Sequence, residues 1–310
     1  MSCPARQTSG FCHEALFYAD SDELLAGTVP FLHEGVEAGE AILVAMPEAN
    51  LDLLRGNLNG ETEQIQFVNM EDLGRNPARI IAAWRDFLGE HYSESRGVRG
   101  IGEPIWAGRS AAELDECRRH ESLLNLAFVD APAWSLLCPY DAANLDDEVL
   151  VAAEHSHPAL SGRSRSAEFA ADGGAAFAGE LAPPAGDRSV ELVFDTSDLH
   201  LVRCLVREQG LQAGLEEQRL DDLVLAAGEI ATNSLRHGGG QGTVEIWGVG
   251  NALVCDFRDS GRIEDPLLGR LRPNSTQVGG RGLWLANQLC DLVQIRSNGT
   301  GSLVRLQMSI

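Results

Sequence analysis

The N-terminal half of the chain alternates short apolar runs with longer segments in which apolar residues recur every three to four positions. The runs are ALFYA, EAILVAM, QIQFVNM, VRGIGEPIW and WSLLCPY. Short apolar runs are typical of buried strands, and the longer spacing is typical of helices with one buried face. Five strand-and-helix pairs in succession predict a mostly parallel sheet with helices on both faces. We therefore expect a three-layer α/β domain over residues 10–160.

Residues 161–188 break this pattern. They have no apolar period and are rich in Ser, Arg, Gly and Ala, with two consecutive prolines. Such a composition is typical of a flexible linker. The linker predicts a second domain over residues 189–310.

The second domain combines one strong helical pattern with several strand patterns. Apolar residues from Arg219 to His237 follow a helical spacing, and the runs at 243–247 and 253–257 predict an antiparallel pair. A glycine- and proline-bearing loop then leads into G-G-R-G-L-W-L-A-N-Q-L-C-D, and two further apolar runs joined by N-G-T-G follow. This order predicts a two-layer α+β domain.

Charge narrows the function classes. The net charge is −22, and all 24 basic residues are Arg. Such a field repels phosphate backbones and anionic lipid, so we expect no direct nucleic-acid or membrane partner. The absence of Lys excludes nucleotide sites built on a Walker A or kinase β3 lysine.

No apolar run approaches the roughly 18 residues of a membrane span, and the first residues lack an apolar signal region, so we expect a cytoplasmic protein.

The seven cysteines are scattered, with no C-x-x-C pair. This spacing indicates neither a disulfide framework nor a zinc cluster, and most cysteines are expected to be small buried residues. Cys12 beside His13 could contribute to a metal or redox site, although two residues fall short of the three or four ligands that such sites use.

Three polar residues share one stripe of the predicted C-terminal helix. Glu229, Asn233 and His237 are each four positions apart, and the helix ends at three consecutive glycines. A solvated polar face is the simplest interpretation of three such residues. Two further glycine clusters favour a ligand site instead: an acid beside a close-approach glycine can read a base, glycines before a helix can hold phosphates, and an Asn can hold a cation.

These segments resemble the N, G1 and G2 boxes of the GHKL ATPase superfamily, in the HATPase_c-type domain. The nearest resemblance is to anti-sigma-factor serine kinases of the RsbW and SpoIIAB type, as in actinobacterial regulators. It implies ATP (or ADP) and Mg²⁺ as cofactors, with Glu229 as the general base and Asn233 as the Mg²⁺ ligand. His237 would lie near the phosphate or lid. The other implied nucleotide contacts are Asp259 and Gly261 at the adenine, Gly280, Gly282 and the Leu283 N–H at the phosphates, and Ser302 behind the adenine.

The chain departs from the first glycine box of this superfamily, usually D-x-G-x-G, because Ile263 stands at the second glycine. Two function classes therefore stay open. One is a serine/threonine kinase that acts on a STAS-type anti-anti-sigma protein and sequesters a sigma factor. The other is a catalytically silent partner-switching module, with or without bound ATP, that holds a sigma factor or its antagonist. The resemblance also implies a homodimer.

The first half resembles the MEDS sensory domain of methanogen and methylotroph regulators. The matching segments are the H-x-x-x-x-Y run from His13 to Tyr18, V-P-F-L-H-E-G-V-E-A-G-E, G-E-P-I-W and Tyr140-Asp141. The resemblance implies a RecA/Rossmann-like fold with sensory use and an unknown small-molecule ligand. Residues near strand ends that could line its pocket are His13, Tyr18, Glu103, Trp106 and Tyr140.

Two other histidine-bearing segments loosely suggest phospho-acceptor chemistry. They are Arg119-His120-Glu121-Ser122-Leu123-Leu124 and Glu154-His155-Ser156-His157-Pro158. No paired-helix dimerisation segment separates them from the second domain, so we interpret them as surface helix residues.

Overall fold

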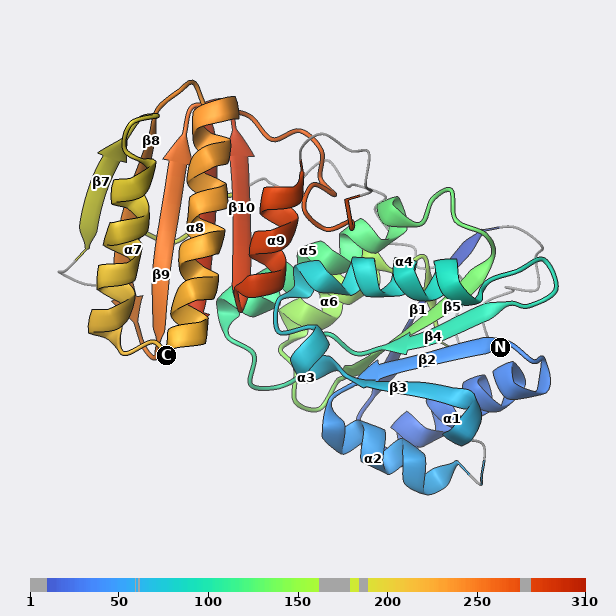
Figure 1. The fold of residues 1–310 in the computed structure, drawn as a ribbon. Helices are drawn as coiled ribbons and strands as arrows, with labels where there is room; N and C mark the ends of the chain where they lie inside the picture. Colours follow the sequence, from blue (N-terminus) through green and yellow to red (C-terminus); the bar gives the residue numbers. More distant parts are fainter. Residues whose placement is uncertain (1–9, 59, 61, 162–178, 184–188, 274–279) are drawn as a thin grey trace. The chain divides into compact units, whose positions relative to one another are not determined.

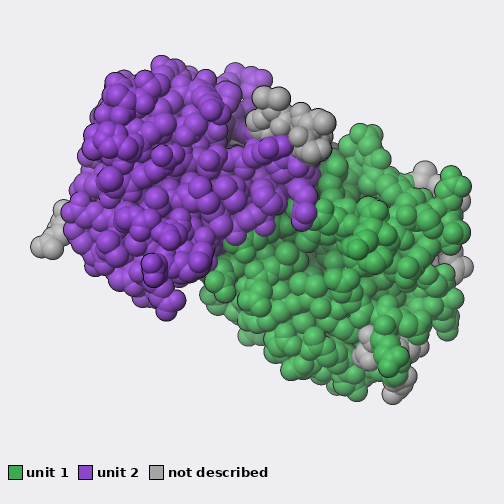
Figure 2. Space-filling view, viewed as in Figure 1, with its two compact units in different colours: residues 1–173 green, residues 174–310 purple. Residues whose placement is uncertain are grey.

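The computed structural model describes residues 10–58, 60, 62–161, 179–183, 189–273 and 280–310. The chain forms two compact units, residues 1–173 and 174–310 (Figure 2). Most of the linker predicted over 161–188 lies outside the described residues. Each unit is described by itself below.

Unit 1 is built on a six-stranded parallel sheet in the order β3-β2-β4-β5-β1-β6. The strands are β1 (Phe11–Tyr18), β2 (Ala41–Met46), β3 (Ile65–Asn69), β4 (Val98–Gly102), β5 (Trp134–Asp141) and the two-residue β6 (Ala159–Leu160). The α/β prediction is confirmed, and β6 adds one strand to the five that the apolar runs indicate.

Helices cover both faces of this sheet (Figure 1). The α-helices are α1 (Ser21–Glu37), α2 (Glu48–Asn57), α3 (Met70–Leu73), α4 (Ile80–His91), α5 (Ala111–Ala127) and α6 (Asp147–Ser156), and the 3₁₀ helices are η1 (Thr62–Gln64) and η2 (Pro77–Arg79). Helix α1 begins where the Asp20 side chain accepts the Glu23 N–H, and a Ser110–Glu113 capping box starts α5. Helices α1 and α2 pack on one face, whereas α4, α5 and α6 lie over the other.

Unit 2 is built on a five-stranded antiparallel sheet in the order β10-β11-β9-β8-β7. The strands are β7 (Val190–Phe194), β8 (Gly242–Val249), β9 (Ala252–Asp259), β10 (Leu292–Asn298) and β11 (Gly301–Ser309). The helices are α7 (Leu199–Ala213), α8 (Glu217–His237) and α9 (Arg281–Leu289), and they lie on one face of the sheet (Figure 1). The α+β prediction is confirmed.

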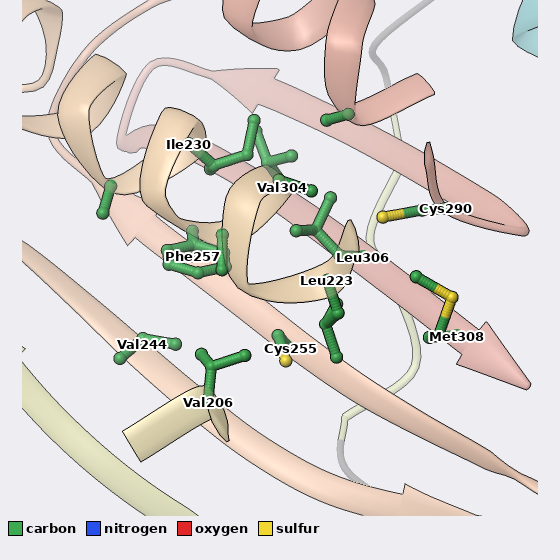
Figure 3. Close-up of a cluster of buried hydrophobic side chains, with 14 of the residues drawn as sticks. Val206, Leu223, Ile230, Val244, Cys255, Phe257, Cys290, Val304, Leu306 and Met308 are labelled. Carbon is green, nitrogen blue, oxygen red and sulfur yellow. The ribbon is translucent and has the colours of Figure 1, made fainter. Parts of the chain in front are cut away.

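The core of unit 2 lies between these helices and the sheet (Figure 3). Val206 of α7 and Leu223 and Ile230 of α8 pack over Phe257 of β9 and Leu306 of β11, all at most 2% exposed. Burial of side chains of this size stabilises the fold by roughly 1.5–3 kcal/mol each. The core holds one face of α8 against the sheet and leaves Glu229 and Asn233 half-buried, next to Gly282 of α9.

No helix within the described ranges is both long and apolar enough to cross a membrane.

Candidate functional site

Helix α8 carries the polar stripe that the sequence indicates. The residues before and after Glu229, Gly228 and Ile230, are buried in the core, whereas Glu229 and Asn233 are half-buried. His237 is the last residue of the helix and is exposed. The geometry therefore places one carboxylate and one amide, a helical turn apart, at the rim of the core.

Helix α9 brings a glycine directly against this stripe. Gly280 caps the helix with a left-handed φ of 79°, a conformation that glycine adopts without strain. A Cβ atom on Gly282 would lie 2.7 Å from Glu229 Oε2 and 3.2 Å from Asn233 Nδ2. The first turn of α9, which includes Leu283, consequently lies next to Glu229 and Asn233. The N–H groups at the start of a helix suit an anion.

The end of β9 forms a second part of the site. Asp259 Oδ1 accepts the Gly261 N–H at 2.8 Å, and the Ser302 hydroxyl donates to the Gly261 carbonyl at 2.9 Å. A Cβ on Gly261 would lie 2.6 Å from the His237 carbonyl oxygen. The turn after β9 is therefore pressed against the end of α8 and held in place from β11.

Ile263 occupies the position where the first glycine box usually has its second glycine. Its N–H donates to Ser297 Oγ at 2.9 Å, and its side chain packs against the unit 2 core. No described residue other than glycine has a positive φ, so this backbone position does not require glycine. The exchange adds an apolar anchor and leaves the Asp259 turn intact.

Three arginines between the end of β9 and the start of α9 have different surroundings. Arg262 is exposed and lies 3.6 Å from Glu264, whereas Arg270 is buried and Arg281 is exposed at the first turn of α9. Residues 274–279, in the loop before Gly280, lie outside the described residues.

The residues proposed for a sensory pocket in unit 1 divide between the two faces of the sheet. The Tyr18 hydroxyl donates to Glu103 Oε1 at 2.7 Å, and Asn50 donates to Glu103 Oε2 at 2.8 Å. His13 and Tyr140 lie on the opposite face, because side chains alternate along a strand. His13 is five positions before Tyr18 in β1, and Tyr140 pairs with Phe17, which shares the face of His13. Trp106 is stacked under the Arg109 guanidinium, 3.7 Å from the ring centroid. Asn50 was not among the pocket residues expected from the sequence, because those were chosen near strand ends and Asn50 lies on helix α2.

Burial raises the pKa of Glu103 to about 7, the nearby Asp141 carboxylate adds to the shift, and the bonds from Asn50 and Tyr18 oppose it. The folded protein therefore holds a proton on Glu103 that the unfolded chain releases between about pH 4.5 and 7. This group's contribution to the unfolding free energy falls as the pH rises through that window, by on the order of 3 kcal/mol in total.

We expect Glu103→Gln to remove this dependence. Relative to the parent chain, the variant gains unfolding free energy between pH 4.5 and 8, on the order of 3 kcal/mol. Urea unfolding at both pH values measures the gain, and the exposed α1 variant Glu37→Gln is the control that shows none. A difference between Glu103→Gln and the parent that is the same at both pH values contradicts the prediction.

The opposite face of unit 1 corrects one expectation from the sequence. His120, Glu121 and His157 are buried, at most 1% exposed, and are not surface helix residues, whereas His155 is exposed. Glu121 lies 3.2 Å from His13 Nε2 and 3.4 Å from His157 Nε2. Burial, and next the neighbouring His157, lower the pKa of His13 to about 4, so its imidazole is neutral at pH 7. The helical pattern of α5 could not show this, because α5 packs onto the sheet with a polar as well as an apolar strip inward.

Comparison with known proteins matches two regions of the chain to different domain models. Residues 12–158 match the family model of the MEDS domain, described as MEthanogen/methylotroph, DcmR Sensory domain. Residues 192–308 match the model of the histidine kinase-like ATPase domain. No curated protein was found to match the chain.

Among solved structures, the chain is similar to the RsbU and RsbW domains of a Mycobacterium tuberculosis protein. The match has 19% sequence identity and a TM-score of 0.31, and it covers 40% of this chain and 33% of that one. The chain thus spans about a third of the solved chain that it matches.

Proposed function

We propose that this chain, which joins a MEDS sensory domain to a histidine kinase-like ATPase domain, is a partner-switching regulator with protein kinase activity. Its C-terminal domain phosphorylates a serine or threonine of a STAS-type anti-anti-sigma protein and, in the other state, holds a sigma factor. The two partners compete for this domain, and the MEDS domain controls the exchange.

The observation that carries the proposal is the close approach of α9 to the polar stripe of α8. Gly282 leaves just enough room for Glu229 and Asn233 beside it, and a methyl group would fill that space. The same approach sets the first turn of α9 beside a carboxylate and an amide. A phosphate-bearing ligand with a divalent cation fits this donor set.

The described residues fit ATP and Mg²⁺. Asn233 would hold Mg²⁺, Gly280, Gly282 and the Leu283 N–H would hold phosphate oxygens, and Asp259 with Gly261 would receive the adenine, backed by Ser302. When bound, ATP supplies the phosphoryl group and Mg²⁺ neutralises the charge that develops on it. His237, exposed at the end of α8, would lie toward the phosphates or the lid.

Glu229 provides the proton chemistry in this proposal. Its carboxylate is half-buried beside the phosphate-binding turn, where it can accept the proton of an acceptor serine or threonine hydroxyl. The hydroxyl oxygen is then free to attack phosphorus. Glu229 and Asn233 share one stripe because both serve the same phosphate.

Ile263 supports a second candidate, a catalytically silent module that holds its partners without transferring phosphate. A bulky residue anchored in the core replaces a glycine that would let this loop move. Silent binding keeps the nucleotide site and loses turnover, so the two candidates differ in one measurable property.

Calorimetric titration with ATP and Mg²⁺ is the first test. We expect micromolar binding in the parent chain and a loss of Mg²⁺-dependent affinity in Asn233→Ala, since the amide oxygen is the proposed ligand. Gln218→Ala, at an exposed position on α8, is the matched control. Absence of binding in the parent chain contradicts the site; binding without transfer to any STAS-type protein favours the silent module.

Asp259→Asn tests the adenine contact. Both oxygens of Asp259 need to be acceptors in this proposal, one for the Gly261 N–H and one for the adenine amino group. An Asn side chain has one acceptor oxygen, so its NH₂ group would face either the Gly261 N–H or the adenine amino group, and both of these are donors. We therefore expect ATP affinity to fall roughly tenfold to a hundredfold. Titration with ATP and ADP checks the result: both weaken equally if Asp259 reads the base, and an unchanged affinity contradicts the assignment.

The partners follow from the same proposal. A small-molecule ligand would bind the MEDS domain near Tyr18, Glu103 and Asn50, where a buried carboxyl carries polar neighbours. We also propose a homodimer and no direct contact with nucleic acid or membrane, in keeping with the net charge of −22. Light scattering of the purified chain measures the oligomeric state.

A further inference from the structure

Four side chains with metal-ligating atoms converge inside unit 1. His13 lies on β1, Glu121 on α5, Cys138 on β5, and His157 directly after α6. Their ligand atoms all lie within 4.8 Å of one another, and none of the four residues is more than 1% exposed. Neither the nucleotide site nor the proposed kinase mechanism uses them.

Three of the six distances between these ligand atoms are close to the edges of a tetrahedral metal site, and all six are within 4.8 Å. His13 Nε2 lies 3.2 Å from Glu121 Oε2 and 3.3 Å from Cys138 Sγ, and His157 Nε2 lies 3.4 Å from Glu121 Oε2. Zinc–ligand bonds of about 2.0–2.3 Å at tetrahedral angles place neighbouring ligand atoms about 3.3–3.8 Å apart. The ligand atoms are thus spaced for one ion at their centre.

Outer hydrogen bonds orient both imidazoles. His13 Nδ1 donates to Asn125 Oδ1 at 3.2 Å, and Asn125 is itself oriented by donating to the Ser156 carbonyl at 2.7 Å. His157 Nδ1 donates to the Ala153 carbonyl at 2.8 Å. With Nδ1 carrying the proton, each Nε2 presents a lone pair to the centre, which is the arrangement found around metal-bound histidines.

Hydrogen bonds within the protein do not satisfy all the polar atoms of this cluster. Within the described residues, neither carboxylate oxygen of Glu121 nor Nε2 of His157 makes a hydrogen bond of normal geometry. The Glu121 contacts of 3.2 and 3.4 Å are also longer than the 2.7–2.9 Å of typical charge-assisted bonds. A buried carboxylate held only by such long contacts is costly. A divalent cation with one carboxylate, one thiolate and two neutral imidazoles gives a group of zero net charge.

We propose that His13, Glu121, Cys138 and His157 form a closed four-ligand site in the MEDS domain for one divalent transition-metal ion, with Zn²⁺ the best match to this donor set. Four protein ligands leave no open position, so the ion is structural and ties β1, β5, α5 and the segment after α6 together. Binding forms the metal–Sγ bond, breaks the Cys138 S–H bond and releases that proton to the buffer.

The test uses the full, untagged chain after dialysis against a chelator. Titration with Co²⁺, a spectroscopic substitute for Zn²⁺, is followed by absorbance. We expect one Co²⁺ per chain, with visible bands of a tetrahedral ion and a near-ultraviolet band from the thiolate. Zn²⁺ added afterwards displaces Co²⁺ and abolishes both signals.

Cys138→Ser and Cys117→Ser form a matched pair, because both thiols are buried in unit 1 and only Cys138 belongs to the cluster. Cys138→Ser loses the thiolate band, whereas Cys117→Ser retains the complete spectrum. The proposal is overturned if the parent chain binds no stoichiometric Co²⁺ or Zn²⁺ at micromolar concentration, or if the thiolate band survives in Cys138→Ser.

Asn125→Ala provides a second variant that keeps all four ligands. Loss of the partner of His13 Nδ1 leaves one ion per chain and weakens its binding about 10- to 100-fold. Competition with a chromogenic zinc chelator measures the change. An unchanged affinity in this variant contradicts the site, even where Cys138→Ser does not fold.

Discussion

We expect Glu229→Gln to abolish phosphoryl transfer and to leave ATP binding nearly unchanged. The amide keeps the size of the side chain, so α9 can stay against α8 with Gly282 in its place. It cannot accept the proton of the acceptor hydroxyl, and loss of a general base costs about 10²- to 10⁴-fold in rate. Transfer of labelled phosphate to a STAS-type antagonist measures turnover, and calorimetry measures ATP affinity.

The control for Glu229→Gln is the same exchange at Glu217, an exposed residue in the first turn of α8. Glu217→Gln retains full activity. Turnover at the parental rate in Glu229→Gln shows that another group takes the proton. A parallel loss of ATP affinity assigns Glu229 to ligand binding.

We expect Gly282→Ala to weaken nucleotide binding and to lower turnover roughly a hundredfold, although alanine by itself favours a helix. The new methyl group would lie 2.7 Å from Glu229 Oε2 and 3.2 Å from both Asn233 Nδ2 and Glu229 Cβ. Contacts this short force α9 away from α8 or turn both polar side chains aside. Either shift separates the N–H groups of α9 from the groups that serve the phosphate.

Gly299→Ala is the matched control in the same unit, because a Cβ at Gly299 meets no atom within 4 Å. It retains parental binding and turnover. Thermal unfolding of Gly282→Ala separates the local effect from loss of the fold, since a displaced α9 lowers the melting temperature by a few degrees while the sheet stays formed. Parental ATP affinity in Gly282→Ala means that α9 does not line the site.

The proposed nucleotide site could be suggested from the sequence because each of its parts lies within a few residues. Glu229 and Asn233 share a stripe through helical geometry alone, and Asp259 with Gly261 forms one turn, so each pair is visible in a few residues. The structure adds how the pairs meet: Gly282 against Glu229, and Ser302 against Gly261. The proposed roles at this site stay predictions until they are measured.

Some local elements escaped the sequence all the same. Strand β7 and helix α7, which complete the sheet and core of unit 2, were not predicted as separate elements. Four of the five residues of β7 are not buried, so its period of two is weak. Strand β7 forms by pairing with β8, and its own sequence pattern does not indicate this pairing.

By itself, the sequence determined the α/β and α+β classes of the two units and suggested the residues of the proposed nucleotide site, because periodicity and glycine placement act over a few residues. Only the tertiary structure decided that His13, Glu121, Cys138 and His157 meet. They are far apart in the chain, and their meeting depends on β1 lying beside β5 and on α5 packing over that pair. Strand order is set by the packing of the whole sheet, and the apolar periodicity of a single segment does not indicate it.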